Sequence, residues 1–384
     1  DIVRNIENVV GTSGNDIVSG DLADNILSGG DGNDVLDGGA GDDELLGGDG
    51  NDTLDSGSGD DVVSGGLGDD LLLAGQGGND FDGGAGENTL DYSSHATATD
   101  INVTLNGATQ ATVSVGNDAN DTVSDVQNVT GTDGDDTVVG DANQNDLIGG
   151  SGNDDLSGMG GHDYLQGDAG SDTLDGGAGD DIIDAGLGND TLIGGLGNDT
   201  LSGGDGVDTA DYSSSATAVT GGTISALSGT VEQGGDTDTL SSIEQFELTA
   251  EDDMLTFDMD ALSSATLDAG AGSDTIAIVD ASGNNLSDAG IEGLELASVF
   301  NNVETIDFTG TDLVAGDTFD IGNDDIGSMV DSGNTLTINV DGVGITVDDI
   351  NVLSQSGATI DSDTTTGSVR TVDWDNGIQL IVNG

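Results

Sequence analysis

Three residue types are absent or nearly absent from this chain of 384 residues, and each absence excludes a class of protein. There is no cysteine, so neither a disulfide framework nor a thiolate metal site can form. There is no proline, which argues against a generic flexible linker. The only basic residues are Arg4 and Arg370, against 76 acidic ones, and the net charge is −74. Nucleic acid and anionic membranes are therefore excluded as partners, because both require a basic patch.

Apolar material is also scarce. Hydrophobic residues make up 33% and aromatic residues 3% of the chain, so an ordinary apolar core would be thin, and composition alone is compatible with disorder. No apolar segment is long enough to span a membrane, and no signal peptide is recognisable. Because the chain begins with Asp1 and not Met, we expect it to be a processed or partial piece of a longer polypeptide.

Glycine and aspartate are abundant, and they recur with a period of nine residues. A nine-residue frame starting at Gly11 continues without slippage to Asp91, and the same frame starts again at Gly131 and continues to Asp211. Each block contains nine repeats, in which position 1 is mostly Gly, position 6 is Asp or Asn, and position 8 is apolar in every repeat. A solvated acidic tract would not keep its register over 81 residues twice.

The blocks belong to a larger unit of about 120 residues. "DIVRNIENVVGT" at the start resembles "DTVSDVQNVTGT" from Asp121, and "DYSSHATA" from Asp91 resembles "DYSSSATA" from Asp211. A third, degenerate unit contains "AGAGSDTIA" from Ala269. We therefore predict a lead-in at 1–10, repeat blocks at 11–91 and 131–211, a spacer or cap at 92–130, a degenerate unit at 212–284 and a C-terminal module at 285–384.

Outside the blocks, alternating apolar and polar residues predict β-strands. Strand pairs are expected around the turn dipeptides Asn106-Gly107, Asp341-Gly342 and Asn376-Gly377, and another strand is expected near Asn301. A single helical turn is expected behind an Asn323 cap.

The pattern Gly-Gly-x-Gly-x-Asp-x-apolar-x resembles the RTX (repeats-in-toxin) nonapeptide, the haemolysin-type calcium-binding repeat, over 162 of the 384 residues. The resemblance implies a parallel β-roll with two nonapeptides per right-handed coil and Ca²⁺ between successive turns. The predicted fold is all-β, with two parallel β-rolls joined by β-hairpin spacers and a C-terminal β-rich module.

The chemistry of the repeat supports calcium independently. Glycine permits the positive φ values of tight turns, and the aspartate at position 6 supplies a hard oxygen ligand. With only two histidines and no cysteine, zinc, copper and iron lack their preferred ligands, and Mg²⁺ keeps its water. About 14 Ca²⁺ are expected from the number of turns. The candidate ligands are Asp16, Asp34, Asp43, Asp52, Asp61, Asp70, Asp136, Asp154, Asp163, Asp172, Asp181, Asp190, Asp199 and Asp208.

Some positions depart from the pattern. Asn replaces Asp at positions 25, 79, 88 and 145, mainly near block ends, and we expect weaker or empty sites there. Asp274 lies in an isolated good repeat and is a weaker candidate ligand. His95 and His162 are expected at the surface, while Tyr92 and Tyr212, at matching places after each block, are expected to plug the end of the roll. Trp374 is expected to pack within the C-terminal module.

Catalytic signatures are missing from the sequence. There is no H-E-x-x-H, no G-x-S-x-G and no lysine for Schiff-base or P-loop chemistry, so we predict no catalytic residues and no enzyme activity within these 384 residues. Carboxylate pairs occur throughout and carry no information about glycosidase chemistry.

Two functions fit these features. The first is a secreted structural protein that folds on Ca²⁺ outside the cell and serves in a surface layer, extracellular filament or adhesin, with self-association into a polymer or lattice and a possible cell-surface or polysaccharide contact. Its C-terminal part is similar to that of type I-secreted RTX adhesins. The alternative is the calcium-dependent folding and type I secretion module of a larger RTX protease, lipase or epimerase. Both imply an extracellular location, no nucleic acid and no membrane span.

Overall fold

A computed structural model describes most of the chain as β-strands joined by tight turns, and the described residues contain no helix. Accordingly, no helix among them could cross a membrane. The structure describes residues 7–95, 99–225, 228–258, 265–279, 299–303, 305–307, 319–322, 335–339, 350–353, 360–366, 369–374 and 379–383.

The chain forms two compact units, with the division inside the second repeat block. Unit 1 contains residues 1–199 and 204–206, and unit 2 contains residues 200–203 and 207–384. Each unit is described separately below.

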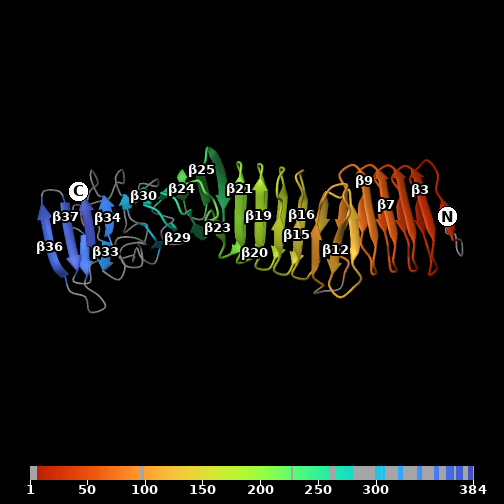
Figure 1. The fold of residues 1–384 in the computed structure, drawn as a ribbon, viewed down its shortest axis with the longest axis horizontal. Helices are drawn as coiled ribbons and strands as arrows, with labels where there is room; N and C mark the ends of the chain where they lie inside the picture. The colour runs from red at the N-terminus through yellow and green to blue at the C-terminus, as the bar shows by residue number, and fades with distance from the viewer. Residues whose placement is uncertain are drawn as a thin grey trace. The chain divides into compact units, whose positions relative to one another are not determined.

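Unit 1 is built of two strand columns, coloured red to yellow-green in Figure 1. Along the first column lie β1 (Asn8–Val10), β3 (Ile26–Asp31), β5 (Glu44–Asp49), β7 (Val62–Leu67), β9 (Asp80–Ala85), β13 (Asp121–Ser124), β12 (Ala111–Val115), β11 (Ile101–Thr104), β15 (Thr137–Val139), β17 (Asp155–Ser157), β19 (Thr173–Ala178) and β21 (Thr191–Leu196). Along the second lie β2 (Ile17–Ser19), β4 (Val35–Asp37), β6 (Thr53–Asp55), β8 (Leu71–Leu73), β10 (Thr89–Asp91), β14 (Asn128–Thr130), β16 (Asp146–Ser151), β18 (Tyr164–Ala169) and β20 (Ile182–Gly188).

One coil of the stack consists of two nonapeptides. In the parallel pairing of β3 with β5, Leu27 lies opposite Leu45, so equivalent residues are 18 positions apart. Both side chains are fully buried, as are the other position-8 residues from Leu27 to Leu192. Each thereby stacks on its equivalent in the next coil, which is how a chain with so few apolar residues forms a continuous core. The predicted all-β fold, a parallel β-roll with two nonapeptides per coil, is confirmed.

The spacer between the repeat blocks belongs to the stack. The predicted strands around Asn106-Gly107 are present, since β11 and β12 pair antiparallel. β12 also pairs antiparallel with β13, which pairs in parallel with β9, while β11 pairs in parallel with β15. Two antiparallel steps restore the original strand direction, so the hairpin is inserted into the column without ending it. In the second column β14 lies between β10 and β16, again in parallel.

Unit 2 repeats this device. One column contains β22 (Thr200–Gly206), β26 (Asp236–Ser241), β25 (Ser228–Gln233), β24 (Val219–Ser225), β28 (Met254–Asp258), β30 (Thr275–Val279), β32 (Thr305–Asp307), β34 (Thr335–Asn339), β38 (Gln379–Asn383), β37 (Val369–Trp374) and β36 (Ile360–Thr366). β25 pairs antiparallel with both β24 and β26, and β24 pairs in parallel with β28, so this hairpin is inserted between β26 and β28. A second column contains β23 (Thr209–Asp211), β27 (Gln245–Glu247), β29 (Thr266–Asp268) and β31 (Phe300–Asn301), and β33 (Phe319–Gly322) pairs with β35 (Ile350–Leu353).

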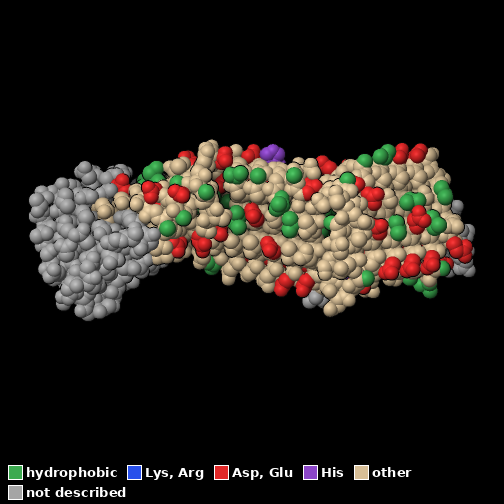
Figure 2. Space-filling view, in the orientation of Figure 1, with side chains coloured by type: hydrophobic (Ala, Val, Ile, Leu, Met, Phe, Trp, Pro, Cys, Tyr) green, Lys and Arg blue, Asp and Glu red, His purple; other side chains and the backbone are tan. Residues whose placement is uncertain are grey.

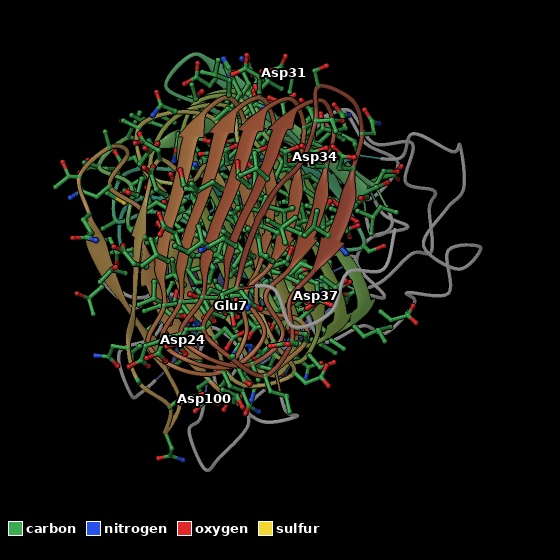
Figure 3. The ribbon with its side chains drawn as sticks, turned by 90° about the vertical axis from the view of Figure 1, so that its right-hand side faces the viewer. Glu7, Asp24, Asp31, Asp34, Asp37 and Asp100 are labelled. Atoms are coloured by element: carbon green, nitrogen blue, oxygen red, sulfur yellow. The ribbon has the colours of Figure 1, made fainter. Side chains whose placement is uncertain are left out.

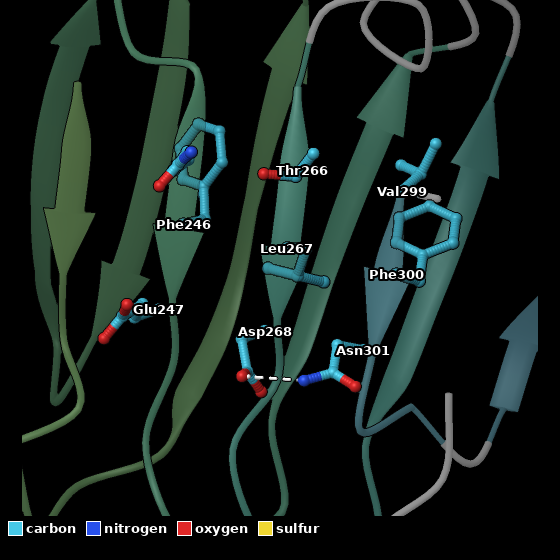
Figure 4. Close-up of a pocket in the computed structure, with 9 residues that line it drawn as sticks. Phe246, Glu247, Thr266, Leu267, Asp268, Val299, Phe300 and Asn301 are labelled. Carbon is cyan, nitrogen blue, oxygen red and sulfur yellow. Dashed lines mark hydrogen bonds between the residues drawn. The ribbon is translucent and has the colours of Figure 1, made fainter. Parts of the chain in front are cut away.

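The core of unit 2 contains aromatic residues beside its buried leucines. Phe246, Phe257 and Phe300 are buried and meet edge to face, with ring centroids 5.8 and 5.7 Å apart. Figure 4 shows the shallow pocket over β27, β29 and β31, where Nδ2 of Asn301 donates to Asp268 at 2.9 Å.

The C-terminal predictions are described only in part. The strands predicted around Asn376-Gly377 are present, because β37 and β38 pair antiparallel, and β31 and β32 lie near Asn301 as predicted. The turn at Asp341-Gly342, the helical turn after Asn323 and the packing of the Trp374 side chain lie outside the described residues.

Candidate calcium-binding ladder

The position-6 residues lie in the turns between the two strand columns. Figure 3 labels one of them, Asp34, which lies toward the same edge of the coils as Asp31 and away from Asp24. All of the predicted ligands except Asp16 are buried. A buried carboxylate requires hydrogen bonds, a cation or a proton, because its desolvation is otherwise too costly.

One carboxylate oxygen of each aspartate is used by the fold itself. Oδ1 of Asp52 accepts a hydrogen bond from the backbone N–H of Asp34 at 2.7 Å, one coil earlier. The same bond joins Asp154 to Asp136 and Asp181 to Asp163, each at 2.8 Å. These bonds form a ladder along the turns in which each aspartate holds the preceding coil.

The other oxygen, Oδ2, faces a different environment. At Gly176, position 1 of its repeat, an added Cβ would lie 2.6 Å from Oδ2 of Asp181 and 2.8 Å from the carbonyl oxygen of Gly194 in the next coil. A carboxylate oxygen and a carbonyl oxygen thus converge where glycine leaves space. Among the described residues, Oδ2 is buried and receives no hydrogen bond in Asp34, Asp43, Asp52, Asp61, Asp70, Asp154, Asp163, Asp172 and Asp181.

The electrostatics follow from this burial. Desolvation raises the pKa of Asp154 to about 7 and the pKa values of Asp61, Asp70 and Asp163 to about 6, against an ordinary value of 3.8, although the ladder hydrogen bonds act in the opposite direction. Charged carboxylates are therefore disfavoured at these positions unless a cation lies beside them.

The residues fit Ca²⁺. The converging groups are all oxygens, from a carboxylate and from backbone carbonyls, which is the ligand set that Ca²⁺ prefers. Nowhere in the described ranges do three His, Cys, Asp or Glu side chains gather as a carboxylate-rich metal cluster would. A cation here would therefore take one or two ladder carboxylates and complete its shell with backbone carbonyls.

A second ladder was not foreseen in the sequence. Each position-5 side chain accepts a hydrogen bond from the backbone N–H of the position-5 residue one coil later. For example, Asp24 accepts from Asp42 at 3.1 Å, and Asp42 accepts from Asp60 at 3.0 Å. These residues are exposed. Acidic side chains lie scattered over the described part of the face shown in Figure 2. The only signal in the sequence was the recurrent Asn-Asp or Asp-Asp pair at positions 5 and 6 of the repeats.

Position-6 residues at the block ends differ from the rest. Thr12 donates to Oδ2 of Asp16 through its N–H at 2.6 Å and its hydroxyl at 2.8 Å. Thr132 binds Oδ2 of Asp136 through the same two groups, at 2.6 and 3.2 Å. Asn replaces Asp elsewhere, and its Nδ2 donates to a carbonyl oxygen: Asn88 to Asp125 at 3.0 Å, and Asn145 to Gln127 at 2.7 Å.

The histidines and tyrosines were predicted with mixed success. His162 is exposed, as predicted, and its Nδ1 accepts from the backbone N–H of Asp180 at 2.8 Å. The surface prediction for His95 holds only in part: the residue is half-buried, its ring packs against Tyr92 with a centroid distance of 5.5 Å, and both ring nitrogens are buried. Tyr92 and Tyr212 are buried, but Tyr92 lies inside the stack and not at its end.

The two repeat blocks match a known family of protein repeats. A family model for the RTX calcium-binding nonapeptide repeat matches residues 10–45, 19–54, 28–63, 37–72, 55–90, 127–156, 157–192 and 185–213. No curated protein matches the chain. Among solved structures, the extracellular lipase LipA from Serratia marcescens matches at 17% identity and a TM-score of 0.21, over 62% of this chain.

The chain covers 38% of that lipase. The family matches fall on the same two blocks in which the buried aspartate ladder lies. The chain therefore contains RTX calcium-binding nonapeptide repeats, which make up both of its regular blocks.

Proposed function

We propose that the chain is a secreted structural protein of a surface layer, extracellular filament or adhesin, and that Ca²⁺ bound along the aspartate ladder drives its folding outside the cell. The observation that carries the proposal is the buried Oδ2 of residues such as Asp181, which converges with a carbonyl oxygen of the next coil and receives no hydrogen bond from the described residues. The proposed ligands are Asp34, Asp43, Asp52, Asp61, Asp70, Asp154, Asp163, Asp172, Asp181, Asp190, Asp199 and Asp208.

Charge explains why folding would depend on the ion. Without a cation the buried carboxylates must take up protons or repel one another, and a single column of leucine or valine per face offers little compensation. Binding free energy then becomes folding free energy. One ion per ladder carboxylate gives about twelve Ca²⁺, close to the about 14 inferred from the sequence. The folded protein would still be strongly acidic.

A structural role is supported by the repeated architecture. The described strands form no catalytic constellation that the sequence or the fold singles out, and the hairpins extend the stack in both units. We propose an extracellular location and no catalysis by these residues.

Electron microscopy tests the structural role. The chain, refolded from its metal-free state by Ca²⁺, is expected to form ordered polymers that disperse on chelation. Dispersed folded monomers at every calcium concentration would contradict self-assembly, while leaving calcium binding intact. If the full-length gene product then proved hydrolytic, the chain would be the secretion and folding module of a larger RTX enzyme.

A further inference from the structure

In the coils that contain the hairpins, the carboxylate at the position-6 level has different hydrogen-bond partners from its equivalents in the regular coils. β13 pairs with β9, which places Asp121 where position 6 of the next repeat would fall, and its Oδ1 accepts from the backbone N–H of Asn79 at 2.7 Å. Its Oδ2, however, accepts from the hydroxyl of Tyr92 at 2.9 Å. The oxygen that faces a carbonyl in the regular coils is here bound by a protein donor.

Unit 2 contains the same arrangement independently. β26 pairs with β22 with Thr239 opposite Thr200, which places Asp238 one coil beyond the position-6 residue Asp199. The Tyr212 hydroxyl donates a hydrogen bond to its Oδ2 at 2.9 Å. Tyr92 and Tyr212 each occupy position 1 of the repeat that follows a block, where the regular repeats have glycine. The phenol ring therefore fills the space that glycine would leave.

The start of each block has its own donor. Thr12 and Thr132 occupy position 2, which is mostly glycine elsewhere, and both bind Oδ2 of their own aspartate through N–H and hydroxyl. Thr249 binds Asp253 of the degenerate third unit in the same way, at 2.9 Å from N–H and 3.0 Å from the hydroxyl. At the starts of all three units and in the two coils that contain hairpins, a Thr or Tyr residue thus donates a hydrogen bond to Oδ2 of the position-6 carboxylate.

We propose that these donors close the calcium columns: Thr at the first coil and Tyr at the hairpin coil take the place of an ion, so that Asp16, Asp136, Asp121 and Asp238 are not calcium ligands. A carboxylate whose second oxygen already receives a hydrogen bond gains less from a cation. The number of ions is then set by where Thr and Tyr occur. This inference depends on the proposed function, and it removes Asp16 and Asp136 from the ligands predicted from the sequence.

The test counts bound Ca²⁺ in the full chain by equilibrium dialysis at saturating calcium, with folding checked by circular dichroism. The two matched variants are Asp121→Asn, in which the Tyr92 oxygen can accept from the new amide, and Asp61→Asn in mid-column. We expect Asp121→Asn and Asp238→Asn to bind as many ions as the wild type. Asp61→Asn is expected to bind at least one fewer.

The outcomes separate the two claims. A loss in Asp121→Asn equal to that in Asp61→Asn, with the wild type binding calcium, overturns column closure alone. Unchanged counts in all variants overturn the ligand assignment of the proposed function, and the inference with it. As a second measurement, Tyr92→Phe should lower the Tm of the calcium-loaded chain, because Asp121 loses its donor, whereas Tyr164→Phe, at a half-buried tyrosine bonded to Gln166, should change the Tm little. Equal Tm shifts in the two variants would contradict the closing role of Tyr92.

Discussion

The backbone N–H of Asp52 donates to Oδ1 of Asp70 at 2.8 Å, and the two residues are one coil apart. The two carboxylate oxygens of Asp70 are therefore not equivalent. Oδ1 holds the preceding coil in register, and Oδ2 is buried without a hydrogen bond from the described residues. A single aspartate per repeat thus both builds the coil and supplies a potential ligand. This double use explains how so short a repeat can specify a fold.

Glycine at position 1 should stabilise the coils in which converging oxygens leave no space for a Cβ, as at Gly176. Gly176→Ala would place a Cβ 2.6 Å from Oδ2 of Asp181, so we expect a loss of about 1–3 kcal/mol in unfolding free energy and a weaker calcium response. Gly14→Ala is the matched control, since no heavy atom lies within 4 Å of its added Cβ. Equal stability of the two variants in urea unfolding would contradict the steric argument.

Mid-column carboxylates should matter more than the amides that interrupt the ladder. We expect Asp163→Ala and Asp172→Ala to raise the calcium midpoint of folding about tenfold, because each removes a charged ligand. Asn88→Ala should raise it less, since the Asn88 amide already donates to the carbonyl of Asp125. Calcium titration followed by circular dichroism measures all three, and a larger shift in Asn88→Ala would argue against the ladder as the binding element.

The metal-free chain should be most stable in acid. The folded pKa of Asp154 is raised to about 7 from 3.8, so the folded coil binds more protons than the unfolded chain between these values. Its contribution to stability is complete below about pH 4 and is lost as the pH rises through about 7. Chain freed of metal by dialysis should therefore retain more β structure at pH 5 than at pH 8. Asp154→Asn should weaken this dependence, and stability that rises with pH would refute it.

The column of buried position-8 side chains should be sensitive to truncation, as a packed core is. Leu54 is fully buried between Leu36 and Leu72 of neighbouring coils, so Leu54→Ala should cost about 2–5 kcal/mol in the calcium-loaded chain. Leu22→Ala, at a side chain that is 87% exposed, should leave the unfolding free energy nearly unchanged. Urea unfolding at saturating calcium compares the two variants. A loss below about 1 kcal/mol in the unfolding free energy of Leu54→Ala would show that the column of buried position-8 side chains is poorly packed.

The periodic part of the fold could be predicted because each repeat position recurs in the same physical environment. Leu36 recurs as the inward side chain and Asp34 as the buried carboxylate, and a period of nine in both identifies the coil. The hairpin at Asn106-Gly107 was visible from its alternation and turn, although its insertion into the column depends on pairings of β13 with β9 and β11 with β15, which are distant in sequence.

The departures from the repeat were harder to predict, because they depend on contacts across many residues. Tyr92 and Asp121 are 29 positions apart, and nothing local in either segment indicates their hydrogen bond. Similarly, the hydrogen bond from the Asp42 N–H to Asp24 can be predicted only when the stacking of the coils is already known. Local chemistry was sufficient for the turns and for the recurrent position-6 aspartates, but not for the Tyr donors that bind Asp121 and Asp238.

The most direct test of calcium-driven folding is far-ultraviolet circular dichroism of the chelated chain during titration with Ca²⁺ and, separately, with Mg²⁺. A cooperative rise of β signal with Ca²⁺ and little change with Mg²⁺ is predicted, because the ladder offers carboxylate and carbonyl oxygens that suit the larger, more flexibly coordinated ion. A chelated chain that already shows its full β signal at neutral pH would contradict the account.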